Sequence, residues 1–308
     1  MVFKEPFISV LSRYFNIDVV NCLSALREFD PWHSPLCTCP AKLTANPYTG
    51  CDHGCVYCYA SSYVPNFSKC RPKKNLIQKL EHEAARLSGE IVSLSNSSDP
   101  YPNLEAEKRL SRDCLKILSR SNCRIQVVTK SNLVLRDIDV LKKVPTVVSL
   151  TITSDSDVLA ERIEPNAPLP SARLKAVEKL VRSGLAVTVR IDPIIPFVND
   201  NPEKLIKEVA SIGVKHITSS TYKVRPDNWK RLCKALPSVA EKLRPLYFEK
   251  GQRLSDYFYL PLDLRRRLMS RVRSLADRYD IRFGVCREDL GGLNTATCDG
   301  SWMFSNQV

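Results

Sequence analysis

The chain has 308 residues, a formal net charge of +13 and twelve cysteines, and 44% of its residues are hydrophobic. This length allows one α/β barrel or two smaller domains, and the composition excludes disordered, collagen-like and coiled-coil chains. No signal peptide is recognisable and no apolar run is long enough to span a bilayer, so we expect a cytoplasmic protein with no membrane partner.

From about residue 43 onward, short β-type runs alternate with helical patterns. The expected strands are Glu90–Ser95, Cys123–Thr129, Thr146–Thr153, Ala186–Asp192, Val214–Ser220 and Ile281–Cys286. The expected helices are Lys73–Ser88, Leu104–Ser119, Val134–Lys142, Pro170–Ser183, Pro202–Ile212, Asp227–Leu243 and Pro261–Tyr279. This alternation predicts βαβ units and a mostly parallel sheet.

Several of these strands carry polar side chains on one face. Ser149, Thr151 and Thr153 alternate with apolar residues, as do Arg190 and Asp192 in the next strand. Parallel strands buried on both faces usually read as continuous apolar runs, so the pattern predicts a polar cavity that holds a ligand. The alternative is that the hydroxyl groups only satisfy local hydrogen bonds.

The most informative stretch contains Cys51, Cys55 and Cys58, spaced Cys-x3-Cys-x2-Cys, with Gly50 and Gly54 beside them. A structural zinc site needs four ligands, so three cysteines in this spacing fit it poorly. Three thiolates on a tight glycine-containing loop suit a four-iron four-sulfur cluster with three ligated irons. The fourth iron is then open, as a catalytic metal position must be.

At these residues, with Tyr57 directly before the last cysteine, the sequence resembles the radical S-adenosylmethionine (SAM) superfamily. The string NPYTGCDHGCVYCYA, followed by SNSSDPYPNLE and RIDPIIPFVND, is similar to its spore photoproduct lyase-like branch, from about Asn46 to Asp200. The resemblance implies an α/β fold, a partial (β/α)6 TIM-type barrel. We expect an N-terminal extension (residues 1–42), a barrel core (43–225) and a C-terminal helical and basic extension (226–308), packed as one unit.

The resemblance also implies the cofactors and the chemistry. Members carry a 4Fe-4S cluster that binds SAM and, once reduced by an electron donor such as ferredoxin or flavodoxin, cleaves it to a 5′-deoxyadenosyl radical. Cys51, Cys55 and Cys58 would ligate the cluster. Tyr57 would lie against the adenine, and the other expected SAM-binding residues are Ser95, Lys130, Ser149, Thr151 and Arg190.

The sequence departs from the lyases at one position. Their hydrogen-donating cysteine falls near the end of the second strand, where this chain has Ser95 and then no thiol up to Asp99. Membership of the lyase-like branch therefore does not establish DNA repair by the lyase's route.

Four further cysteines flank the core, namely Cys37, Cys39, Cys286 and Cys298. If the chain ends meet, these thiols could hold a second iron-sulfur cluster or a zinc ion, because four cysteines suit either. The alternatives are disulfides or unpaired structural cysteines.

The positive charge is concentrated in the last third of the chain. Between Lys223 and Arg282, sixteen Lys and Arg stand against seven Asp and Glu, an excess of +9. The expected helix from Pro261 contains Arg265, Arg266, Arg267, Arg271 and Arg273, and the preceding loop interleaves basic residues with aromatic ones, including Tyr257 and Tyr259. Basic side chains that bind phosphates and aromatic ones that stack on bases are typical of nucleic-acid recognition.

Three functions follow as hypotheses. The first is a radical SAM enzyme that acts on nucleic acid, by lyase-like lesion repair or base modification. The second is a radical SAM enzyme for a small anionic metabolite or a peptide. The third is a non-catalytic iron-sulfur protein that binds nucleic acid, against which the open iron position argues.

Overall fold

The computed structural model describes residues 24–29, 34–95 and 97–306. Its main feature is an eight-stranded sheet in the order β1-β2-β5-β6-β7-β8-β9-β12, in which only the β1–β2 pair is antiparallel. The strands are β1 (Leu26–Glu28), β2 (Leu43–Ala45), β5 (Ser88–Leu94), β6 (Asn122–Thr129), β7 (Thr146–Thr151), β8 (Ala186–Ile194), β9 (His216–Thr221) and β12 (Arg282–Val285). The predicted α/β partial barrel is confirmed.

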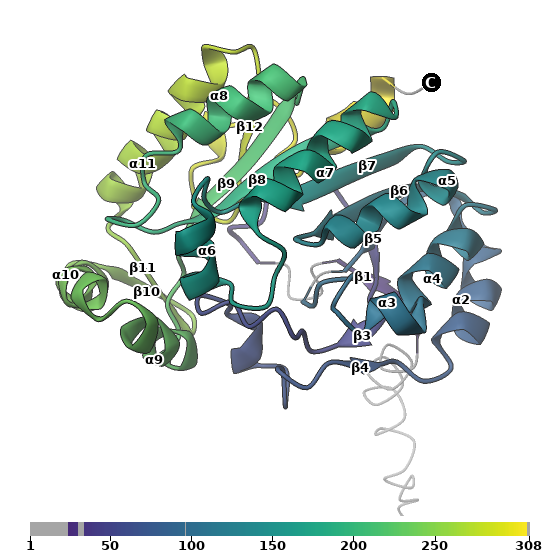
Figure 1. The fold of residues 1–308 in the computed structure, drawn as a ribbon, viewed down its shortest axis with the longest axis horizontal. Coiled ribbons are helices and arrows are strands. Elements are labelled where there is room, and N and C mark those ends of the chain that lie inside the picture. The colour runs from purple at the N-terminus through teal and green to yellow at the C-terminus, as the bar shows by residue number, and fades with distance from the viewer. Residues whose placement is uncertain (1–23, 30–33, 96, 307–308) are drawn as a thin grey trace, which may run out of the picture.

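Most of the helices form a layer along the outer side of the sheet, whereas α9 and α10 lie away from it, beside β10 and β11 (Figure 1). The helices are α2 (Leu76–Ala84), α3 (Glu105–Lys108), α4 (Leu110–Leu118), α5 (Ile138–Leu141), α6 (Asp157–Ile163), α7 (Pro170–Arg182), α8 (Glu203–Ile212), α9 (Pro226–Ala235), α10 (Pro237–Phe248) and α11 (Leu262–Asp277). Short 3-10 turns are η1 (Ala60–Ser62), η2 (Asn132–Asp137), η3 (Gly291–Leu293) and η4 (Ser301–Asn306). Two small antiparallel strand pairs lie outside the sheet, β3 (Tyr48–Thr49) with β4 (Arg71–Pro72), and the hairpin of β10 (Gln252–Leu254) with β11 (Tyr257–Tyr259).

Three expected helices are each divided in two. The helix expected over 134–142 falls across the 3-10 turn η2 and the short helix α5. The helix expected over 104–119 breaks at Arg109, whose φ of 52° is left-handed and interrupts the helical hydrogen bonds. The helix expected over 227–243 breaks before Pro237, because proline starts a new helix more readily than it continues one. Strand β12 lies beyond the expected core range and pairs with β9, so the C-terminal third contributes to the sheet.

The two faces of the sheet differ: the face toward the outer helices is apolar, and the opposite face carries polar side chains. Val148 and Leu150 of β7 are fully buried in the cluster that contains the apolar residues of the outer helices. Ser149 alternates with them and is also buried, as the sequence pattern predicts. No helix in the described part of the chain combines the length and apolar character that a bilayer crossing requires.

The C-terminal segment lies against the polar side of the sheet. A Cβ on Gly300 would meet Thr188 of β8, and Asp299 forms a buried ion pair of 2.5 Å with Lys42, which precedes β2. Gln126 of β6 joins this pair by accepting from Lys42 at 2.9 Å. The segments that flank the core in sequence therefore meet at the inner face of the barrel.

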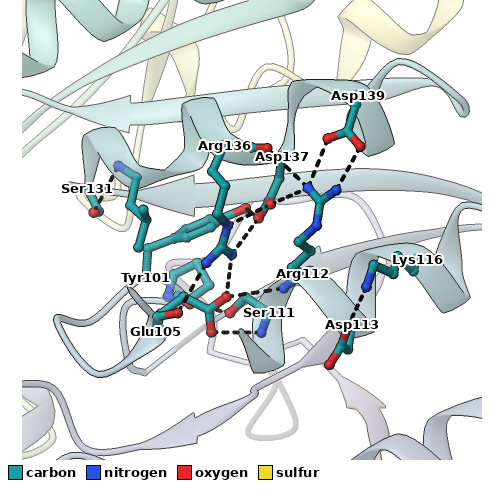
Figure 2. Close-up of polar contacts among 12 residues, drawn as sticks. Tyr101, Glu105, Ser111, Arg112, Asp113, Lys116, Ser131, Arg136, Asp137 and Asp139 are labelled. Carbon is teal, nitrogen blue, oxygen red and sulfur yellow. Dashed lines mark hydrogen bonds and ion pairs between the residues drawn. The ribbon is translucent and has the colours of Figure 1, made fainter. Parts of the chain in front are cut away.

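A buried ion network holds the segment after β5 against α4 and η2 (Figure 2). Arg136 forms ion pairs with Glu105 at 2.5 Å and with Asp137 at 2.9 Å, and both carboxylates are 0% exposed. Arg112 bridges the same Asp137 at 2.8 Å and the exposed Asp139 at 2.7 Å. Glu105 also accepts from the hydroxyl of Tyr48 in β3, so the network supports the strand that leads to the three-cysteine loop.

We expect Asp137→Asn to lower the free energy of unfolding by about 2 kcal/mol, because it removes the buried carboxylate that Arg112 and Arg136 share and with it their charge-assisted hydrogen bonds. The matched change Asp139→Asn removes a carboxylate that is 58% exposed from the same Arg112 and should cost less than about 1 kcal/mol. Urea unfolding of both variants measures the difference. Equal losses would contradict a special role for the buried carboxylate.

Candidate radical SAM site

The three-cysteine loop runs from β3 to η1. It turns at Gly50, whose φ is +81°, and a Cβ there would collide with the carbonyl oxygen of Phe67. The next peptide is tied to the same point, since the N–H of Cys51 donates to the Phe67 oxygen at 2.8 Å. Glycine is therefore required at the entrance of the loop.

Peptide N–H groups point at two of the three thiols. The sulfur of Cys51 accepts from the N–H of His53, and the sulfur of Cys58 accepts from those of Ala60 and Ser61. Burial raises the pKa of both thiols, while these hydrogen bonds oppose the increase because they favour the thiolate.

Several charged side chains lie near Cys55. Burial raises the pKa of its thiol to about 12, and the positive charge of Lys130 acts in the opposite direction. The Lys130 ammonium is 5.5 Å from the ring centroid of Tyr57. The cation that the sequence analysis selected thus lies beside the cysteine loop.

The carboxylate of Glu164, at the end of α6, connects this loop to the barrel. It accepts a hydrogen bond from the hydroxyl of Tyr57 and another, at 2.7 Å, from that of Thr153. Its second oxygen forms an ion pair of 2.5 Å with Arg173 of α7, and both side chains are almost completely buried. Burial raises the pKa of Glu164, but Arg173 and Lys130 more than offset that effect and the pKa is lowered overall.

Helix α9 holds the loop from another direction. Arg231 donates to the carbonyl oxygen of Cys58 at 2.6 Å, and Asn228 donates to that of Tyr57 at 3.1 Å. Asp227 accepts from the hydroxyl of Ser61 at 2.5 Å. Sequence reasoning missed these residues and Glu164, because their spacing to the cysteines in the chain carries no recognisable signal.

The other expected SAM-binding residues lie at or near the ends of the strands. Ser95 is buried directly after β5 and has a φ of +78°, and Ser149 and Thr151 are buried in β7. Arg190 has an internal partner, since it forms an ion pair of 2.5 Å with Asp192. A largely buried arginine requires an anionic partner, and for Arg190 the chain itself supplies one.

The basic C-terminal region divides into buried and exposed parts. Arg265 is 1% exposed and donates to the carbonyl oxygen of Glu288, so it is a structural residue, and Tyr259 is also buried. Arg266 and Arg267 are exposed on α11, a helix that packs on β9 and β12. Tyr257 of the β10–β11 hairpin makes an edge-on contact with Tyr59, with 5.7 Å between ring centroids. Because Tyr59 follows Cys58, this hairpin lies at the cysteine loop.

The structure brings only some of the flanking cysteines together. The sulfur atoms of Cys39 and Cys298 are 3.4 Å apart, and Cys37 hydrogen-bonds to Cys39. Cys286 instead hydrogen-bonds to Arg190. Among the described residues, the only three potential metal ligands with donor atoms all within 4.8 Å of one another are Cys51, Asp52 and His53.

The sequence profile of the radical SAM superfamily matches residues 45–209, more than half of the chain. The chain belongs to the radical SAM superfamily. It is a radical SAM enzyme, and the family implies a 4Fe-4S cluster and SAM as its cofactors. Three thiols on one glycine-containing loop, with the cation Lys130 nearby, fit the three-cysteine ligation of such a cluster.

Two related sequences cover different shares of the chain. An uncharacterized protein of Mycobacterium bovis is 28% identical over 284 residues, which cover 84% of this chain and 80% of that protein. One from Methanocaldococcus jannaschii is 34% identical over 167 residues, 52% of this chain and 63% of that one.

A spore photoproduct lyase variant with bound AdoMet and dinucleoside spore photoproduct superposes with a TM-score of 0.60 at 16% identity, covering 80% of this chain and 76% of that one. A radical S-adenosylmethionine methyltransferase from Kitasatospora setae superposes at 0.54 with 12% identity, covering 85% of this chain and 57% of that one. At these identities, the likeness shows the fold that the radical SAM enzymes share.

We expect Glu164→Gln to lower the free energy of unfolding of this radical SAM enzyme by about 3 kcal/mol, because Arg173 then lacks its buried counter-charge. The variant should also retain less iron after anaerobic reconstitution, since Tyr57 loses its carboxylate acceptor. Chemical denaturation and iron analysis measure the two effects. The control is Glu161→Gln on the exposed face of α6, which should change stability by no more than about 0.5 kcal/mol. A Glu164 variant indistinguishable from this control would refute the role assigned to the carboxylate.

Proposed function

We propose that this radical SAM enzyme acts on a nucleic acid, in which it repairs a lesion or modifies a base. The observation that carries the proposal is the contact between Tyr59 and Tyr257, which places the aromatic and basic β10–β11 hairpin at the cysteine loop. Aromatic side chains offer stacking surfaces to bases, and neighbouring cations attract phosphates. A substrate held by this hairpin would lie next to the cofactor site.

We infer that Cys51, Cys55 and Cys58 ligate the 4Fe-4S cluster. When bound, the cluster and SAM supply one-electron cleavage of the sulfonium and a radical that abstracts hydrogen. Lys130 supports the proposal as the residue that binds the SAM carboxylate, because it is a partly buried cation beside the loop.

The remaining side chains of the site shape the pocket around SAM. We infer that Tyr57 contacts the adenine from a position held by Glu164, and that Ser95 offers polar groups to the methionine part. Ser149 and Thr151 line the inner side of β7, while Arg190 is already paired with Asp192 and contributes a neutral ion pair to the wall. A small one-electron carrier, such as a ferredoxin or flavodoxin, is the reductant that we propose.

We also propose that the flanking thiols hold a second metal centre, built around Cys39 and Cys298. Their sulfur separation of 3.4 Å is close to the edge of a thiolate tetrahedron, about 3.8 Å for zinc-sulfur bonds of about 2.3 Å. Cys37 supports the proposal as a third ligand, because its side chain already hydrogen-bonds to Cys39. Cys286 is the fourth candidate and would have to exchange its contact with Arg190 for the metal.

Replacing Cys51, Cys55 and Cys58 together by Ala should abolish formation of 5′-deoxyadenosine from SAM, because no cluster ligand remains. The same triple variant should keep about one zinc ion, or about four irons, if the flanking thiols form a second centre. Product chromatography and metal analysis give the two results independently. Persistent SAM cleavage would overturn the assigned ligands, and a metal-free triple variant would overturn the second centre.

The affinity of the parent enzyme for single-stranded DNA or RNA should fall linearly with the logarithm of salt concentration, by about 0.7 per phosphate neutralised. Addition of the correct nucleic acid should also raise 5′-deoxyadenosine formation. Fluorescence anisotropy across a salt series, followed by turnover on a panel of nucleic acids, measures both. Affinity that ignores salt would favour a small anionic metabolite or a peptide as the substrate.

A further inference from the structure

Two arginines from distant parts of the chain converge on one aromatic ring. The guanidinium carbon of Arg225, just before α9, is 4.8 Å from the ring centroid of Tyr257, and that of Arg287, just after β12, is 5.5 Å away. Both side chains are partly buried. Like charges repel, so two guanidinium groups on one ring indicate a place that is prepared for negative charge.

Both arginines have unused hydrogen-bonding capacity. The Nε atoms of Arg225 and Arg287 are buried, and neither has a hydrogen-bond partner among the described residues. In the same part of the chain, the ion pair of Arg225 is with the highly exposed carboxylate of Asp256, at 3.2 Å, and no ion pair joins Arg287 to a carboxylate. Buried donors are nearly always satisfied, so these two are available to a bound ligand.

Neighbouring cations at this end of the barrel are paired. Lys223 forms an ion pair of 2.8 Å with Glu288, which also lies 3.5 Å from Arg265. Glu288 follows Arg287 directly in the chain, yet its carboxylate is directed to these other cations and to Thr221. The missing counter-charge of Arg287 is therefore a local feature and not a general property of the barrel mouth.

The backbone at Arg287 carries a conformational cost. Its φ of 57° is left-handed, a region that a residue with a Cβ rarely adopts. Such conformations persist where the surrounding structure enforces them, and they cluster at ligand sites. The turn after β12 thus directs this guanidinium toward Tyr257 and, through the contact of Tyr257 with Tyr59, toward the cysteine loop.

We propose that Arg225 and Arg287, which both contact the ring of Tyr257, form the binding site for a phosphate group of the substrate. The inference rests on the proposed action on nucleic acid and assigns the phosphodiester beside the reacting nucleotide to this site. Guanidinium groups match phosphate oxygens with paired, charge-assisted hydrogen bonds. The Tyr257 ring then leaves the adjacent base close to Tyr59, the residue that follows the last cysteine.

The test uses the full-length reconstituted enzyme and two single-stranded DNA 12-mers of identical sequence, one with phosphodiester and one with uncharged methylphosphonate linkages. Arg287→Gln and Arg225→Gln should each weaken binding of the phosphodiester strand about 10-fold or more, as loss of a charge-assisted hydrogen bond requires. Binding of the uncharged strand should be the same in the variants and the parent. Arg287→Lys should restore part of the lost affinity.

The matched control is Arg120→Gln. This arginine is exposed just after α4, a helix on the outer side of the sheet and away from the β10–β11 hairpin, so its change removes the same charge and should alter affinity less than about 2-fold. If the parent binds DNA in a salt-dependent way and neither Gln variant differs from this control, the phosphate site is refuted while the proposed function stands. If the parent binds both strands equally or neither strand, the proposed function and the site both fail. Circular dichroism shows whether each variant is folded, and Arg225→Gln decides the matter if Arg287→Gln is not.

Discussion

The candidate site depends on one buried carboxylate, that of Glu164. A carboxylate without exposure to water is stable only when positive charge and hydrogen-bond donors surround it, and Glu164 has Arg173, Tyr57 and Thr153. Tyr57 directly precedes Cys58. Its hydrogen bond to Glu164 therefore fixes the cysteine loop relative to α7 and to the end of β7. The loop has little regular structure of its own, and packed elements on each side fix its conformation.

Helix α9 completes that support and links it to the proposed substrate site. Its first two turns bond to the loop through Asn228 and Arg231, and Arg225 directly precedes the same helix. The side chain that we assign to a phosphate is therefore mechanically connected to the segment that we assign to the cluster. Such an arrangement keeps the distance between substrate and radical source constant, which radical chemistry requires because a misplaced radical reacts with the protein.

At the open end of the barrel, the cations that pair with a carboxylate of the chain differ from those that are available to a ligand. Arg190, Lys223 and Arg265 each have a carboxylate of the chain within ion-pair distance, so they stabilise the fold. Arg287 has none among the described residues, although it is adjacent to Glu288. An excess of positive charge in the sequence indicates an anionic partner in general terms, and only the pairing pattern shows which cations are available to it.

The sequence by itself determined the parallel α/β fold and the family, because strand-helix alternation and the spacing of Cys51, Cys55 and Cys58 are local signals. It also selected Lys130, whose place after a strand brings it to the end of the barrel where the cysteine loop lies. It could not show which basic and aromatic residues of the C-terminal region are buried and which lie at the site. Arg265 and Tyr259 are buried, whereas Arg225 and Arg287 both contact the ring of Tyr257.

The roles of Glu164, Asn228 and Arg231 were likewise decided only by tertiary structure. Each acts through a contact with a residue far away in the chain, and such contacts leave no periodicity or spacing in the sequence. The pairing of the flanking cysteines has the same explanation. The segments around Cys39 and Cys298 do meet, but the direction of each side chain brings Cys39 to Cys298 and Cys286 to Arg190. Spacing along a chain specifies a motif, whereas the partners of a buried charge or thiol depend on how the elements pack.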